Sequence, residues 1–112
     1  MADVLSVAEL PGSKSASRFE GRDYGASISF FVTRTPPGSG ATLHRHPYEE
    51  TFIVREGKAS FTVGDENVEV EAGQILIVPG GTAHGFVNSG DQTLKLVSIH
   101  PSDHVVMESL AE

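Results

Sequence analysis

Short apolar segments alternate with turn residues along most of the chain, and this pattern predicts β-strands rather than helices. The segments are rich in valine, isoleucine, threonine and phenylalanine, and turn-forming residues separate each from the next. Clear examples are residues 26–34, 50–54, 59–63, 75–78 and 93–100. Many short strands joined by close turns are typical of an antiparallel barrel or sandwich, so we predict an all-β fold. Residues 105–110 could form a short helix or a terminal strand.

The alternation within each strand predicts which side chains face the interior. In the last strand Lys95 should point to water, so every second residue beside it should point inward. The inward set is then Leu94, Leu96, Ser98 and His100. We likewise expect Glu50, Phe52 and Val54 to face the interior together. Residues 75–78 are uniformly aliphatic, so we expect the core to cover one face and a second subunit to cover the other.

The first 25 residues carry the weakest pattern. Residues 4–7 and 15–19 are candidate short strands, separated by the turn-forming sequence Leu-Pro-Gly-Ser. A partly disordered tail is the alternative, because chain termini are often loose. We therefore divide the chain into an N-terminal arm, residues 1–25, and a β-barrel domain, residues 26–112.

The composition of the chain argues against several classes of partner and site. The 112 residues are enough for one domain, and the absence of cysteine removes both disulfides and thiolate metal ligands. A net charge of −7 argues against a nucleic-acid partner, which would need a basic surface. The longest aliphatic run has four residues, far too few for a membrane span, and the first ten residues lack the basic segment of a signal peptide. We therefore expect a cytoplasmic protein.

Three histidines and one glutamate have a spacing that suits a metal site. His44 and His46 are one residue apart, so on a strand both imidazoles project from the same side. Pro47 marks a bend, after which Glu50 opens the next strand, and His84 begins another strand after a turn. Three nitrogen donors and one oxygen donor suit one divalent transition metal per chain, either Mn, Fe, Co, Ni, Cu or Zn. Octahedral coordination would leave two positions for a substrate.

The same residues form two sequence motifs. The first reads G-x5-H-x-H-x3-E-x6-G from Gly38 to Gly57, and the second reads G-x5-P-x-G-x2-H-x3-N from Gly73 to Asn88. Both resemble the motifs of the cupin superfamily at every specified position, and the short spacer between them resembles that of small single-domain cupins. The resemblance implies a double-stranded β-helix, or jelly-roll barrel, with the metal inside. It implies no particular reaction, because this fold hosts many.

Several residues keep a second interpretation. A degenerate, metal-free barrel is the alternative to a metal site. The motif spacing favours Glu50 over its neighbour Glu49, which we interpret as solvated. His100 and Tyr48 are the candidate catalytic residues, although His100 could instead be an ordinary strand-end histidine. We expect His104 at the surface. We interpret four glycines as turn residues: Gly57, Gly73, Gly80 and Gly81. We interpret three phenylalanines as barrel-filling residues that could instead form the wall of a pocket: Phe30, Phe52 and Phe86.

The sequence therefore predicts a metal-dependent enzyme that acts on a small polar molecule. We place oxygenase- or isomerase-like chemistry ahead of decarboxylation. The alternative is a non-catalytic protein that binds or senses a sugar or another small ligand. We also expect a homodimer, with the N-terminal arm adding strands to the partner as in many small cupins. Its interface would cover an outward apolar set: Thr51, Ile53, Ile75, Ile77, Val97 and Ile99.

Overall fold

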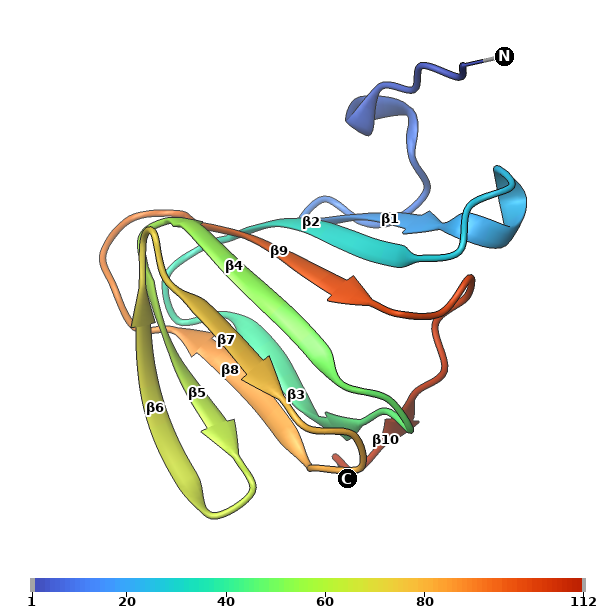
Figure 1. Cartoon of the computed structure of the whole chain (residues 1–112). Helices are drawn as coiled ribbons and strands as arrows, with labels where there is room; N and C mark the ends of the chain where they lie inside the picture. The colour runs from blue at the N-terminus through green and yellow to red at the C-terminus, as the bar shows by residue number, and fades with distance from the viewer. Residues whose placement is uncertain (1, 112) are drawn as a thin grey trace.

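Two antiparallel five-stranded sheets face each other in the computed structural model, which describes residues 2–111 (Figure 1). One sheet has the order β1-β2-β9-β4-β7 and the other the order β10-β3-β8-β5-β6. The strands are β1 (Ala16–Glu20), β2 (Ser29–Thr35), β3 (Gly40–Arg45), β4 (Glu50–Glu56), β5 (Lys58–Val63), β6 (Glu66–Glu71), β7 (Ile75–Val78), β8 (His84–Asn88), β9 (Leu94–His100) and β10 (Glu108–Ser109). Strands distant in sequence pair with one another, as in a jelly roll, so the predicted all-β fold is confirmed.

Apolar side chains fill one end of the space between the sheets. The buried core consists of Phe52, Val54, Ala59, Phe61, Val70, Val78, Leu94 and Leu96. Phe52 and Phe61 meet across the sheets edge to face, with ring centroids 4.8 Å apart. Removing either ring would cost about 3–5 kcal/mol of unfolding free energy. The predicted parity of β9 is confirmed, because its four inward residues are buried whereas Lys95 is exposed and pairs with Glu56 at 2.9 Å.

The N-terminal segment only partly follows the prediction. The candidate strand at 15–19 corresponds to β1, which pairs with β2 of the same chain. The candidate strand at 4–7 does not form, and a 3-10 turn, η1 (Val7–Glu9), begins at its last residue. No sheet edge of the described chain lies beside residues 4–7 in the structure, where this segment extends away from the barrel (Figure 1). The arm's role in a dimer stays a prediction.

The outer face of the β7 edge is apolar and open. Ile75 and Ile77 are 64% and 63% exposed, and the neighbouring Ile53 and Val97 are only half-buried. An edge strand with apolar side chains and free backbone groups is a surface that proteins normally cover. A second copy of the chain would cover it, although the structure contains one chain.

We expect a double substitution, Ile75→Lys with Ile77→Lys, to convert a homodimer into a monomer, because four charged amino groups would meet in the covered interface. Light scattering at micromolar concentration measures the mass. The matched control is Val87→Lys, which places a charge at an exposed apolar position on the other sheet and should leave the dimer intact. A wild-type chain that is monomeric at this concentration would contradict the prediction.

Candidate metal centre

The four predicted ligands meet at one end of the barrel. His44 lies near the end of β3, His46 one residue beyond it, and Glu50 and His84 are the first residues of β4 and β8. One ligand atom from each of the four lies within 4.8 Å of the others. The structure therefore brings together all four residues that the sequence analysis singled out.

Two glycines let the second motif pack against the first. The Gly81 N–H donates a hydrogen bond to the His46 carbonyl at 2.7 Å, and Gly81 has a positive φ of 77°. A Cβ on Gly80 would lie 3.0 Å from the Pro47 carbonyl oxygen, so the bend needs a residue without a side chain there. These contacts set the distance between His46 and His84, and they confirm the predicted turn role of both glycines.

The ligand nitrogens surround one oxygen of Glu50. Its Oε1 lies 2.7 Å from Nε2 of His84, 3.0 Å from Nε2 of His46 and 4.0 Å from Nε2 of His44. Glu50 is 4% exposed, and His46 and His84 are buried as well. The carboxylate therefore has little contact with water and depends on these neighbours.

In each of the three ligand histidines, the other ring nitrogen, Nδ1, contacts a backbone carbonyl. Each Nδ1 lies 2.7 or 2.8 Å from a carbonyl oxygen, and since a carbonyl can only accept, each Nδ1 carries a proton. The partners are Thr42 for His44, Val106 for His46 and Thr82 for His84. In the neutral rings the lone pair is then on Nε2, which faces Glu50. Backbone carbonyls orient metal-binding histidines in this way.

These donors fit a bound metal ion. Three lone pairs directed at a carboxylate repel it unless a cation lies among them. Nε2 of His46 makes no hydrogen bond of good geometry with the described residues, although it is completely buried. A divalent ion at this point would satisfy all four ligands at once and leave two octahedral positions free.

The directions of the pKa shifts at Glu50 and His44 also favour a bound cation. Burial would raise the pKa of Glu50, but protons on the Nε2 atoms of His100, His46 and His84, present when no metal is bound, outweigh burial and hold that pKa well below its usual range. Burial lowers the pKa of His44. Burial also acts to lower the pKa of His46, yet the contacts with Glu50 and the Val106 carbonyl raise it overall. A proton therefore competes with a metal at His46.

The two candidate catalytic residues lie directly behind Glu50. Nε2 of His100 is 3.3 Å from Oε2 of Glu50, and Nδ1 of His100 is 2.8 Å from the Tyr48 hydroxyl. The Tyr48 ring stacks on His46 with centroids 5.3 Å apart. Burial raises the pKa of the Tyr48 hydroxyl. The inward position of His100 is confirmed, whereas the catalytic role of both residues stays a prediction. His104 is partly exposed and lies 2.7 Å from Asp103.

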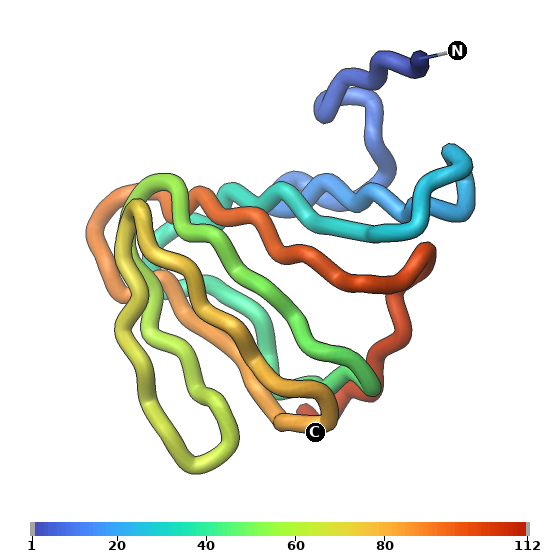
Figure 2. Tube along the Cα trace, viewed as in Figure 1, coloured from blue at the N-terminus to red at the C-terminus, as the bar shows by residue number. Residues whose placement is uncertain are grey.

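The C-terminal segment, residues 104–110, is part of the site that the sequence analysis missed. It descends from β9 to the end of the barrel where β4 begins (Figure 2). The Val106 carbonyl accepts the proton of His46 Nδ1, and the Val106 N–H donates to the Tyr48 hydroxyl at 3.1 Å. No local signal links residues 60 positions apart. The carbonyls that orient His44 and His84 do have a local sequence signal, because each belongs to the threonine of a Thr-x-His sequence, Thr42 or Thr82.

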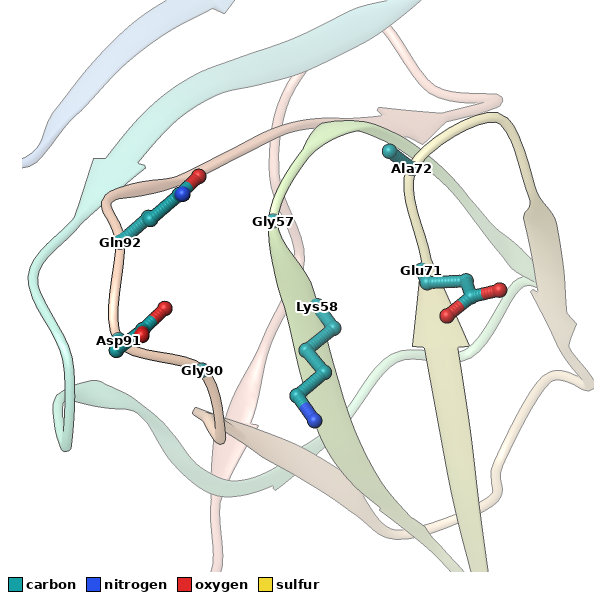
Figure 3. Close-up of a pocket in the computed structure, with 7 residues that line it drawn as sticks. All are labelled: Gly57, Lys58, Glu71, Ala72, Gly90, Asp91 and Gln92. Carbon is teal, nitrogen blue, oxygen red and sulfur yellow. The ribbon is translucent and has the colours of Figure 1, made fainter.

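A cavity of about 440 Å³ adjoins the ligands. His44, His46, Glu50 and His100 form part of its wall. Most of the rest comes from residues of β1, β2, β3, β4, β8, β9 and the C-terminal segment. A second hollow of about 320 Å³ lies at the far end of β4, where Lys58 projects between Glu71 and Asp91 (Figure 3). None of the four ligands lines this second hollow, so the chemistry belongs to the first.

Residues 31–100 match the family model described as a cupin domain. An uncharacterized protein of Methanocaldococcus jannaschii is 35% identical over 77% of this chain and 71% of its own length. An oxalate-binding protein of Thermotoga maritima is 28% identical over 62% of this chain and 59% of its own length.

Solved structures resemble the whole chain. The oxalate decarboxylase of Bacillus subtilis, which has Mn(II) centres, superposes with a TM-score of 0.82 at 25% identity, covering 92% of this chain and 30% of that one. A protein with a double-stranded β-helix domain from Klebsiella pneumoniae superposes over the full length of both chains, with a TM-score of 0.77 at 24% identity. The second likeness shows the fold alone. No helix among residues 2–111 is long and apolar enough to cross a membrane.

We expect one divalent transition metal to bind per chain and to stabilise the folded state. At about 100 times the dissociation constant, free metal should add about 2.7 kcal/mol, a melting shift on the order of 10 °C. His44→Ala and His84→Ala should each abolish the shift and the bound metal, measured by thermal melting and elemental analysis. His104→Ala is the matched control and should bind normally. Near-stoichiometric metal that persists in both ligand variants would contradict the assignment.

Deleting residues 105–112 should weaken metal binding about 10- to 100-fold, the usual effect of losing a group that orients a ligand. Without the Val106 carbonyl, the His46 ring is free to rotate and to change tautomer. Metal affinity measured by chelator competition tests this expectation. Deletion of residues 111 and 112 alone is the control, because it leaves the Val106 contacts in place. Equal affinity of the two truncated chains would disprove the role of Val106.

Proposed function

The chain belongs to the cupin family, and we propose that it is a metal-dependent enzyme that acts on a small molecule. One observation carries this proposal. Three imidazole nitrogens and one carboxylate oxygen converge beside a cavity large enough for a small substrate, and His44, His46 and Glu50 line it. A substrate in that cavity would lie beside the ion and occupy its free positions.

We assign the ligand role to His44, His46 and His84 through Nε2 and to Glu50 through Oε1. When bound, the ion supplies Lewis-acid chemistry and, if it is a redox-active metal, electron transfer. The similarity to a decarboxylase with Mn(II) centres supports manganese among the candidate metals. The donor set itself suits any of the late divalent ions.

We assign His100 and Tyr48 a positioning role first. Tyr48 accepts from the Val106 N–H and contacts Nδ1 of His100, which directs Nε2 of His100 toward Oε2 of Glu50. This contact leaves Oε1 facing the three ligand histidines. His100 is also the sole titratable side chain, other than the ligands, among the described residues that line the cavity. A reaction that needs a protein group to move a proton therefore depends on His100, whereas oxygenase- or isomerase-like chemistry at the ion needs few such groups.

A second candidate is a binding protein without catalysis. The same scarcity of acid–base groups favours it, and one relative is an oxalate-binding protein. In this alternative the ion is only a fixed Lewis acid, so redox-inert zinc should serve as well as iron or manganese.

We expect the Fe(II)-loaded protein, prepared without air and then mixed with air, to consume dioxygen faster with at least one member of a panel of diketones, catechols, thiols and hydroxy acids. An oxygen electrode measures the rate. The Zn(II)-loaded protein is the control and should show no increase. The same panel followed by NMR under nitrogen detects isomerisation or decarboxylation, which need no dioxygen.

The binding alternative has its own signature. It predicts tight, saturable ligand binding with no turnover under air or nitrogen, and Glu50→Gln would then weaken only that binding. Glu49→Gln is the matched control, because Glu49 is exposed and lies one position away from the ligand. This result would replace the enzyme proposal with the binding one.

A further inference from the structure

Apart from Glu50 and the histidines, the described residues that line the cavity are all uncharged. Hydroxyl groups of threonine and serine and apolar side chains make up the wall. The wall includes Thr33, Ser98, Phe31, Phe86 and Leu96. No lysine or arginine is present there to neutralise an anionic substrate.

Several cations near the cavity are held by other groups. Arg18, opposite Phe31 on β1, pairs with Glu20 at 3.3 Å. The Arg45 guanidinium holds Glu108 through contacts of 2.8 and 3.3 Å and does not line the cavity. Arg34 contacts the Ser17 hydroxyl at 3.2 Å. Lys58 lies at the far end of the barrel (Figure 3). Among the described residues that line the cavity, none adds a positive charge to that of the ion.

The charges at the site then add simply. A divalent ion contributes two positive charges, Glu50 contributes one negative charge, and the histidines are neutral ligands because their Nδ1 protons face carbonyls. The net charge is +1. A monoanion makes the site neutral, whereas a dianion leaves an uncompensated negative charge in a cavity with no other cation. Burying such a charge is strongly unfavourable.

Aromatic rings lie beside the ligand His84 and beside His100. Phe31 of β2 meets the His100 ring edge-on at 5.6 Å, and Phe52 meets the His84 ring at 6.0 Å and Phe86 at 6.2 Å. A bound molecule must therefore place its polar head at the ion and an apolar portion against these rings. A fully polar molecule such as oxalate would leave this surface without apolar contacts.

We propose that the substrate is a monoanionic bidentate chelator with an apolar substituent, such as a 2-hydroxy acid with a hydrocarbon side chain or an enolised diketone. Phe31 and Thr33 are specificity-determining residues, because they place an apolar and an uncharged surface where a dianion would need a cation. The inference rests on the proposed metal centre and extends it to a substrate class. It also sets this chain apart from its oxalate-binding relative.

The test uses three 2-hydroxy acids with the same chelating head, together with oxalate. The full chain loaded with Co(II) is titrated with phenyllactate, lactate, malate and oxalate, and the visible absorption of the ion reports binding. We expect phenyllactate to bind at least 10-fold tighter than lactate, because its phenyl group is buried, and at least 10-fold tighter than malate or oxalate. In water a second carboxylate strengthens chelation of a free ion, so only the cavity can reverse that order.

Two variants locate the selectivity. Thr33→Arg should raise the affinity for malate and oxalate at least 10-fold, whereas Thr62→Arg, at an exposed position on β5, should change neither. Phe31→Ala should lower the affinity for phenyllactate and leave that for lactate unchanged. Cobalt content, measured for each variant, shows that the site is intact.

The inference and the proposed function fail separately. Malate or oxalate binding as tightly as phenyllactate, or no binding of phenyllactate, overturns the substrate class even if some other compound is turned over. Conversely, the expected order of binding with no turnover of any compound contradicts the enzyme proposal alone.

Discussion

A buried carboxylate facing three imidazole lone pairs is the constraint on which the rest of the structure depends. Glu50 is nearly inaccessible to water, and Nε2 of His46 and His84 lies within 3.0 Å of its Oε1. An ionised group in such a place requires a positive charge close by. The bend between β3 and β4, the two glycines before His84 and the backbone carbonyls behind each ring all hold this arrangement in place. The protein is therefore built to keep a cation at this end of the barrel.

Phe52 joins that polar end to the apolar core. It lies two residues beyond Glu50 on β4, so both side chains point inward, and its ring contacts Phe61 on one side and approaches His84 on the other. Glu50 and His84 are thus the first residues of β4 and β8, strands that the core holds through Phe52 and Phe86, whereas His46 lies one residue beyond β3. Rigid elements hold ligands with less positional freedom than loops do, which favours a fixed coordination geometry.

The sequence predicted the residues whose signal is local. Spacing alone placed His44, His46, Glu50 and His84 together, and strand alternation turned His100 inward. What it missed depends on contacts distant along the chain. The Val106 peptide reaches His46 and Tyr48 across more than 50 residues. The walls supplied by Phe31 and Thr33 follow from the pairing of β2 with β9, which no periodicity within β2 reveals. Residues 4–7 have the composition of a strand. Such a segment forms a strand only where a neighbouring strand is free to pair with it.

The contact between Val106 and His46 also has a consequence for biosynthesis. During translation the residues of both motifs leave the ribosome before Val106 does, so the barrel strands can begin to pair while His46 still lacks its orienting carbonyl. The fully oriented set of donors exists only after the C-terminal segment has emerged and docked. A metal that binds at this site would therefore meet the complete set of oriented donors only in the finished barrel.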